Sequence, residues 1–316
     1  MRATLVRQVL SALAAALALT VLVFVLIRLI PGDAITLWIG QEGSMPPQVQ
    51  DTLRRMFGLT DPVYQQYLRW LGDLVRGDLG YSFRSRLPVA PLLLQAVPYT
   101  VELAFGATLV STLVAVPLGV LSAVRRNSWL DVLARLLALV GLSMPTFWIG
   151  VLLILLSSAA FHWLPSLSYV GLFQNPWQNA QQLFMPCLTL ALPLMGVVMR
   201  MTRSSVLEVL GQDYVRTARA KGIAAQLVLV RHALPNAAIP IVTIVGIQLG
   251  QLLGGAVIVE QIFGVPGLGT ALISSISERD YPVVQGAILI TGLAFILIQF
   301  LVDISYSFLD PRVQRS

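Results

Sequence analysis

The residues of this chain that could do chemistry gather in one basic segment, which runs from Asp213 to Pro235. Three cations lie between Arg216 and Lys221, and Arg231 follows them. The whole chain is 56% hydrophobic and only 11% charged, so this cluster requires a physical reason. Because a cation in hydrocarbon costs about 3 kcal/mol, the segment must lie in water, where its charges can bind a polar partner.

The basic segment predicts a hairpin of two short helices. One face of the first helix should be apolar or neutral, because four residues follow a helical spacing: Val206, Leu210, Tyr214 and Thr217. Arg216 and Arg219 form a cationic face beside it, and Gly222 should end the helix. A second helix over residues 225–233 returns the chain to the membrane. We expect this rigid protrusion to dock on a partner; the alternative is a solvated loop whose cations only set topology or attract anionic lipid.

No nucleotide-binding or catalytic motif accompanies the hairpin. Lys221 is the only lysine, and it lies between Ala220 and Gly222 instead of in the Gly-Lys-Ser/Thr ending of a P-loop. The chain has two histidines and one cysteine and no metal-binding cluster of them. We therefore predict no catalytic residue, no metal site and no cofactor bound by this chain, and a packing role for Cys187. The carboxylates nearest the apolar stretches lie near the ends of those stretches, which argues against a proton relay: Glu102, Glu260 and Asp303.

Six apolar stretches must position the hairpin. A membrane-spanning helix needs about 20 mainly apolar residues, and charge-free gaps of that length recur along the chain. The predicted spans lie near residues 8–30, 98–124, 133–161, 183–202, 237–260 and 283–305. The polar residues and prolines at 162–182 predict a surface loop. The first span could instead be a signal peptide, but its apolar run exceeds the usual length of about 7–15 residues, which favours a retained helix.

The distribution of arginine and lysine orients these spans. Cations precede the first span, lie between the second and third and between the fourth and fifth, and follow the sixth. The loop after the third span has no arginine or lysine, and the loop after the fifth has only Arg279. The positive-inside rule therefore places both termini and the basic hairpin in the cytoplasm. Because the cations flank spans and do not form one patch, we expect no nucleic-acid binding.

We therefore expect an all-α membrane protein with six transmembrane helices. The N-terminal transmembrane helix would comprise residues 1–30, and an external loop with short amphipathic helices would comprise residues 31–97. A five-helix core would comprise residues 98–316 and would include the hairpin at residues 203–236.

The external loop contains an amphipathic helical pattern. Asp61 and Pro62 should begin a helix, and Gly77 should end it. Its apolar face would comprise Val63, Tyr67, Trp70, Leu71 and Leu74. A second short helix is predicted over Gln48–Phe57. These helices either cover the protein's own loops or form a docking surface.

The fifth span carries two further sets of candidate residues. Gly246, Gly250 and Gly254 recur every four residues, a spacing that lets helices approach closely in a membrane. We favour packing within the chain for them, with contact to a partner subunit as the alternative. Gln248 and Gln251 are candidates for a pathway lining, because an amide in hydrocarbon is costly unless it is paired or hydrated.

The hairpin resembles a sequence motif found in the permease subunits of binding-protein-dependent ABC importers. This motif has the form Glu-Ala-Ala-x3-Gly-x9-Ile-x-Leu-Pro. Aligned on Gly222, the chain departs from the motif at Arg216, Thr217 and His232. Its Tyr-x-Arg-Thr-Ala-Arg-Ala-Lys-Gly run is similar to the dipeptide/oligopeptide/nickel branch of that family. Other fragments, in the same order, are similar to that branch: Pro31–Asp33, Gln66–Trp70, Gly77–Gly80, Ser143–Pro145, Pro266–Gly269, Arg279–Pro282 and Leu309–Arg312.

The resemblance implies a type I ABC importer permease fold in the bacterial cytoplasmic (inner) membrane. The expected partners are a second homologous permease subunit, two ABC ATPase subunits that bind ATP and Mg, an extracytoplasmic substrate-binding protein and membrane lipid. The chain would form half of the translocation pathway and would not itself be an enzyme. The hairpin would be the coupling helix and would contact one ATPase through Tyr214, Arg216, Thr217, Ala218, Arg219, Ala220, Lys221 and Gly222. Within that set, the cations would make polar contacts, the alanines would permit close approach and the glycine would set the turn.

The cargo follows less directly from the sequence. We expect di- or oligopeptides, with nickel or a metal chelate carried by the same mechanism as the alternative. A secondary transporter would require deep charges or inverted repeats, and a membrane enzyme would require a catalytic constellation. Neither feature is evident in the sequence, so both alternatives are weaker.

Overall fold

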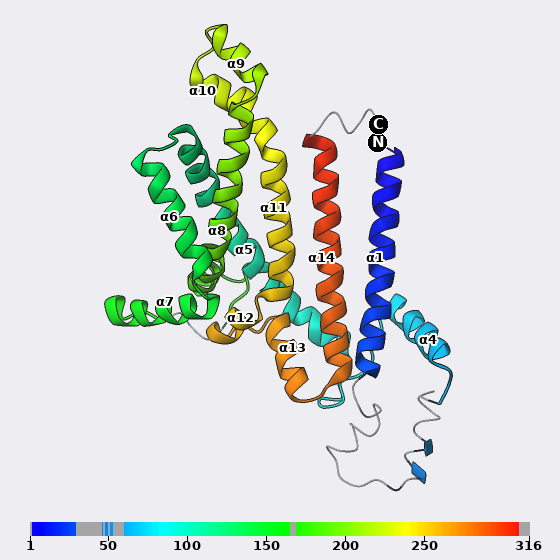
Figure 1. Cartoon of the computed structure of the whole chain (residues 1–316). Coiled ribbons are helices and arrows are strands. Elements are labelled where there is room, and N and C mark those ends of the chain that lie inside the picture. The colour runs from blue at the N-terminus through cyan, green and yellow to red at the C-terminus, as the bar shows by residue number, and fades with distance from the viewer. Residues whose placement is uncertain are drawn as a thin grey trace.

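The computed structural model describes residues 2–29, 46, 48–49, 51–52, 60–164 and 169–309. Within these residues the secondary structure is helical, apart from turns, loops and one isolated β-bridge between Tyr81 and Pro88. Figure 1 shows a bundle of long helices with short helices at both of its ends. The predicted all-α class is therefore confirmed.

Within the described residues, five long helices form the bundle, and each is long and apolar enough to cross a membrane. They are α1 (Arg2–Arg28), α5 (Val89–Val124), α8 (Pro176–Leu210), α11 (Leu234–Gly255) and α14 (Tyr281–Leu309). These helices confirm the first, second, fourth, fifth and sixth predicted spans, although several of their ends differ from the prediction.

Two helices begin earlier than the sequence pattern indicates. The predicted boundary at residue 98 is wrong, because α5 begins at Val89 and continues through Pro98. The predicted surface loop is also wrong from Pro176 onward, where α8 begins. The Asn175 side chain caps this helix by accepting a hydrogen bond from the Gln178 amide at 3.2 Å, and a proline in the first turn needs no hydrogen-bond partner for its nitrogen.

Two of the polar residues that indicate a loop in the sequence, Asn179 and Gln182, are instead buried in the first turns of α8. Asn179 donates to the Glu102 carboxylate at 2.7 Å and to the Val170 carbonyl at 3.0 Å. Tyr169 donates to the same carboxylate. Burial, reinforced by that carboxylate, raises the pKa of Tyr169, so its hydroxyl stays protonated as a donor. Paired in this way, polar side chains are compatible with a helical segment.

The predicted third span, residues 133–161, is not one continuous helix. It consists of α6 (Trp129–Ser143) and α7 (Thr146–Phe161), which meet at 104°. The bend occurs at Met144, whose ψ of 130° is extended. Pro145 favours this conformation, because a proline disfavours the helical region for the residue before it. Figure 1 shows α7 lying across the direction of the long helices.

A second bent pair follows α11, which ends at Gly255 and not at the predicted residue 260. It comprises α12 (Val257–Phe263) and α13 (Leu268–Ser277), at 91° to each other. Gly264 ends α12 with a φ of +66°, a conformation that glycine adopts without steric cost. The described residues thus hold five candidate spans, or up to seven if each bent pair counts as one, a range that includes the predicted six.

The arrangement of the helix ends confirms the predicted topology. The beginning of α1, the end of α14 and the hairpin helices α9 (Asp213–Ala220) and α10 (Ala225–Val228) lie at one end of the bundle (Figure 1). The external helix α4 (Val63–Val75) and α13 lie at the opposite end. The first end is the cytoplasmic one, because the hairpin and the helix ends beside it carry the excess of arginine and lysine.

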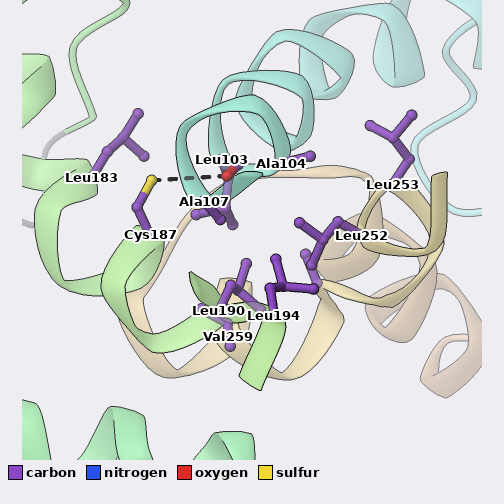
Figure 2. Close-up of a cluster of buried hydrophobic side chains, with 11 residues drawn as sticks. Leu103, Ala104, Ala107, Leu183, Cys187, Leu190, Leu194, Leu252, Leu253 and Val259 are labelled. Carbon is purple, nitrogen blue, oxygen red and sulfur yellow. Dashed lines mark hydrogen bonds between the residues drawn. The ribbon is translucent and has the colours of Figure 1, made fainter. Parts of the chain in front are cut away.

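The centre of the bundle is the contact of α5 with α8, to which α11 and α12 contribute (Figure 2). Cys187 is buried there, and its Sγ lies 3.8 Å from the Leu103 carbonyl oxygen. A Cβ at Gly106 would lie 2.7 Å from this sulfur, so the absence of a side chain permits the approach. Lipid is as apolar as these side chains, so close packing holds such helices together.

The external helix packs on the protein's own first span. Tyr67 and Trp70 of α4 place their rings 5.2 and 5.6 Å from that of Phe24 in α1. The Tyr67 and Thr20 hydroxyls lie 2.9 Å apart and form a hydrogen bond. The predicted helix is confirmed, and the aromatic part of its apolar face covers α1. The second predicted helix, Gln48–Phe57, falls largely outside the described residues.

Candidate functional site

The basic hairpin projects beyond the ends of the neighbouring helices (Figure 1). It comprises α9, α10 and a single π-helical turn at Leu229–Ala233, which continues into α11. The predicted beginning of the hairpin at residue 203 is wrong, because α8 extends to Leu210. The hairpin is therefore a rigid extension of two membrane-spanning helices.

A small apolar cluster holds the hairpin together. Val215, Ala218 and Val228 are buried, and Leu210 and Ile223 pack against them. These contacts join the end of α8, the inner face of α9 and the returning α10. The hairpin thus has its own core, which fixes the orientation of its outer face.

The predicted apolar or neutral face does not run along one continuous helix. Tyr214 is 46% exposed, and Thr217 is also exposed. The prediction assumed one continuous helix, whereas the chain leaves the helical path at Gly211 and Gln212. α9 therefore begins with a new helical phase, which places Val215 on the inside.

The two alanines of the motif have different environments. Ala218 is only 7% exposed because it packs inside the hairpin, so little of its surface is available to a partner, and its role in close approach stays a prediction. Its small size lets α9 approach α10 closely. Ala220 is exposed and remains a candidate for close approach of a partner.

The cations occupy the outer surface of the hairpin. Arg216, Arg219 and Lys221 are all exposed. Arg216 lies 3.5 Å from the Asp213 carboxylate, in a pair whose side chains are 74% and 96% exposed. Such an exposed pair is worth at most about 1 kcal/mol. Within the described chain, Arg219 and Lys221 make no ion pair, so their charge is available to an acidic partner surface.

Gly222 forms the turn between the two helices and has a φ of +77°. Its amide donates to the Arg219 carbonyl at 2.9 Å, and the Ile223 amide donates to the Ala218 carbonyl at 3.3 Å. This pair of hydrogen bonds is a Schellman motif, which favours glycine at this position. The prediction that Gly222 ends the helix is confirmed.

A buried ion pair fastens the helices below the hairpin. Asp131 of α6 is 0% exposed and accepts two hydrogen bonds from Arg203 of α8, at 2.8 and 3.0 Å. It also accepts from the Ser122 hydroxyl of α5 at 2.6 Å and from the Asn127 amide at 3.0 Å. The cytoplasmic ends of α5, α6 and α8 are thus joined at one carboxylate.

Asp131 was not predicted from the sequence, although one local signal is present. Ser128 and Asp131 have the spacing of a helix N-cap and its third residue, and the Asp131 amide donates to the Ser128 hydroxyl at 3.4 Å. The partner Arg203 is 72 residues away, so the ion pair itself has no signature in the sequence.

A second buried carboxylate, Glu260 of α12, organises the external end. It accepts a hydrogen bond from the Thr100 hydroxyl of α5 at 2.6 Å and another from the Thr270 amide of α13 at 2.9 Å. The Thr100 oxygen in turn accepts from the Leu268 amide at 2.8 Å. Gly267 passes so close that a Cβ there would lie 2.3 Å from the carboxylate. The position of Glu260 near the end of a predicted span did not indicate that its side chain is buried.

The glycines of the fifth span pack within the chain. A Cβ at Gly246 would lie 2.0 Å from Val302, and one at Gly250 would lie 2.8 Å from Phe295. Both neighbours belong to α14, which supports the favoured packing within the chain at these two positions. Gly254 is exposed, and its partner contact stays a prediction.

The two glutamines of the fifth span differ in exposure. Gln248 is half-buried and Gln251 is exposed. Neither observation tests their predicted place on a pathway. Among the described residues, no group of three or more His, Cys, Asp or Glu side chains could hold a metal ion.

Comparisons with known proteins agree with this architecture. The family model "Binding-protein-dependent transport system inner membrane component" matches residues 115–315, and the model of the N-terminal part of such membrane components matches residues 1–104. The dipeptide transport system permease protein DppB of Escherichia coli K12 is 40% identical, over 94% of each chain. DppB of Alkalihalophilus pseudofirmus is 37% identical, over 99% of this chain and 100% of its own.

A solved structure shows the same fold. The MetNI methionine ABC transporter in an inward-facing conformation matches 69% of this chain and 96% of its own, with a TM-score of 0.54 and 20% identity. The residue motifs, the helix order and the family models therefore converge. The chain belongs to the inner-membrane components of binding-protein-dependent transport systems: it is a multi-pass permease subunit of an ABC importer in the cytoplasmic membrane, of the peptide branch, and ATP hydrolysis belongs to a separate subunit.

Proposed function

We propose that this permease carries di- or oligopeptides and that α9 is the element through which an ATPase drives it. Its partners would be a second homologous permease subunit, two ATPase subunits that bind ATP and Mg, and an extracytoplasmic substrate-binding protein. The names of the two DppB relatives support the peptide cargo. The chain would form half of the translocation pathway.

The observation that carries the docking role is the outer face of α9. Arg216 and Arg219 lie on a short helix, and Lys221 directly follows its end; the inner face of this helix is fixed by the hairpin's apolar cluster. A partner that pushes on α9 would therefore move a rigid body instead of deforming a loop. Cations fit an acidic cleft, and electrostatic complementarity of this kind gives an interface its specificity.

The connections of the hairpin support transmission of this movement into the membrane. α9 follows α8 after two residues, and the π-helical turn leads directly into α11. The Asp131–Arg203 pair links α8 to α6, and Ser122 extends the link to α5. We infer that these helices move together when the ATPases close, and that Gln248 and Gln251 of α11 line the pathway that opens.

Charge reversal on α9 tests this function. We expect a triple variant, Arg216→Glu, Arg219→Glu and Lys221→Glu, to lose ATPase co-purification and to reduce ATP-driven uptake of a labelled dipeptide at least tenfold. Removing charged partners from an interface commonly costs about 2–5 kcal/mol. The matched control is Arg126→Glu, an exposed cation at the same end of the bundle that lies outside the hairpin.

Three outcomes would contradict the proposal. Normal uptake by a triple variant present in the membrane at wild-type amounts would remove α9 from the coupling role. An equal loss in the Arg126→Glu control would indicate a general charge effect. Uptake of nickel without uptake of dipeptide would replace the peptide cargo by a metal and leave the role of α9 intact.

A further inference from the structure

A cleft of about 360 Å³ lies between α6 and α8, separate from the hairpin. Its lining includes Ser122, two residues before the cytoplasmic end of α5, and Ser204, six residues before the end of α8. At 1.5 Å per residue these positions lie within about 10 Å of the helix ends. The lining also includes Arg200, ten residues before the end of α8, and Leu142, near the external end of α6, so the cleft runs from the cytoplasmic helix ends into the apolar part of the bundle.

The packing of α6 on α8 explains why the cleft exists. The two helices are in close contact on its external side: a Cβ at Gly141 would lie 2.5 Å from the Leu192 carbonyl oxygen, and one at Gly196 would lie 2.6 Å from that of Ala138. Towards the cytoplasm, the small residues Ala134 and Ala138 of α6 face α8 and leave space between the helices. The cleft is thus a consequence of the sequence of α6.

Three arginines are among the residues that line this cleft: Arg135, Arg200 and Arg203. The carboxylate of the fully buried Asp131 accepts a hydrogen bond from Arg203 at 2.8 Å. The Arg135 Nε lies 3.5 Å from the same carboxylate, with its side chain 54% exposed. Arg200 is exposed and makes no ion pair with any described residue. The carboxylate pairs with two of the three arginines, Arg135 and Arg203, so the cleft retains positive charge.

The remaining wall of the cleft is apolar. Leu139, which is 60% exposed, and Leu142 line it on the side of α6. The same helix exposes further large apolar side chains, among them Leu136 at 53% and Leu133 at 45%. This surface has the composition of a face that contacts acyl chains. A ligand that contacts both the arginines and the apolar wall must combine an anionic group with a hydrocarbon chain.

We propose that this cleft binds one anionic phospholipid of the cytoplasmic leaflet. Its phosphate would lie between Arg135 and Arg200, and an acyl chain would lie along Leu139 and Leu142. Basic pockets between transmembrane helices on the cytoplasmic side are known to take such headgroups. A free phosphate or a peptide carboxylate would leave the apolar wall uncovered, which favours the lipid. The bound lipid would join α6 to α8 beside the buried Asp131.

Lipid retention by the full-length chain tests this proposal. The chain, in detergent micelles, is mixed with equimolar phosphatidylglycerol and phosphatidylcholine of identical acyl chains, and the bound lipid is measured by native mass spectrometry. We expect phosphatidylglycerol to be retained about tenfold or more over phosphatidylcholine, because each arginine near an anionic headgroup strengthens binding roughly fivefold. The Arg135→Gln, Arg200→Gln double variant should lose most of this preference.

Two further variants and one competitor isolate the source of the binding. Arg126→Gln, at an exposed arginine outside the cleft, should change retention less than about twofold. Leu142→Gln should weaken phosphatidylglycerol retention without a change of charge, since each buried CH₂ contributes about 0.8 kcal/mol, which corresponds to roughly fourfold in affinity. Glycerol phosphate, which has the anionic group and no acyl chain, should not displace the lipid at equal concentration.

The outcomes are decisive in both directions. Equal retention of the two lipids by the wild-type chain, or unchanged retention by the double variant, would overturn the proposal. An equal loss in Arg126→Gln would show nonspecific surface attraction, and full displacement by glycerol phosphate would show a small-anion site; either result rejects a lipid site. If the double variant does not fold, the wild-type preference and the competition experiment still decide.

Discussion

At the scale of single residues, one glycine determines whether the coupling hairpin can form. Gly222 has a φ of +77°, yet a Cβ there would meet no atom within 4 Å. Backbone strain alone therefore opposes substitution, by about 1–2 kcal/mol for an ordinary residue. We predict that Gly222→Val lowers dipeptide uptake severalfold while ATP hydrolysis continues, and that Gly222→Asn, which tolerates this conformation, retains most of the uptake.

The matched control for that prediction is Gly72→Ala. Gly72 lies within α4 and has an ordinary helical backbone, and a Cβ at this position would also meet no atom within 4 Å. Uptake should remain at the wild-type level in this variant. If Gly222→Val and Gly222→Asn reduce uptake equally, side-chain volume and not backbone conformation is the cause.

Asp131 is the residue whose loss should most weaken the cytoplasmic half of the bundle. Asp131→Asn leaves Arg203 without its carboxylate, and breaking a buried pair in this way costs about 3–5 kcal/mol. We predict a clearly lower melting temperature of the detergent-solubilised chain. Asp213→Asn, at a side chain that is 96% exposed, should leave that temperature unchanged. A stable Asp131→Asn variant would show that helix packing alone holds α5, α6 and α8.

At the scale of elements, the sequence predicts helices well and their interruptions poorly. Long apolar stretches correctly indicated five continuous helices, because a segment that crosses hydrocarbon must pair its backbone groups internally, as a helix does. The third span differs from the prediction of one continuous helix, because Pro145 separates α6 from α7, which meet at 104°. The prediction also failed at the beginning of α8, because Asn179 is polar and finds its partner, Glu102, 77 residues away. A contact between distant segments decided this second case, whereas the bend before Pro145 has a local cause.

The bent pair of α12 and α13 yields a prediction at this scale. Gly267 has a φ of −90°, which any residue adopts, but a Cβ there would lie 2.3 Å from the Glu260 carboxylate. Gly267→Ala should push this carboxylate away from Thr100 and lower the melting temperature, since overpacking costs about 1–3 kcal/mol. Gly171→Ala, with no neighbour within 4 Å, is the control. An unchanged melting temperature in Gly267→Ala would mean that the pair does not depend on Glu260.

At the scale of the whole molecule, the distribution of arginine and lysine predicted best which segments lie at the same end of the bundle. Arginine and lysine counts placed the hairpin and both chain ends on one side, and the structure brings α9, the start of α1 and the end of α14 to one end of the bundle. The site itself was only partly predictable. Residue spacing identified Gly222 and the exposed cations of the hairpin. The inward orientation of Ala218 depends on the break in the helix at Gly211, and the periodicity of the sequence does not predict the geometry of that break.

This topology has a direct test because the chain contains a single cysteine. Cys187 is only 6% exposed in the bundle core, so the wild-type chain should react little with a membrane-impermeant maleimide. Val75→Cys, at a position of α4 that is 82% exposed, should be labelled in intact spheroplasts. Arg219→Cys, on the outer face of α9, should be labelled only after the membrane is permeabilised. Labelling of Arg219→Cys in intact spheroplasts would place the hairpin outside the cell, where no ATPase could reach it.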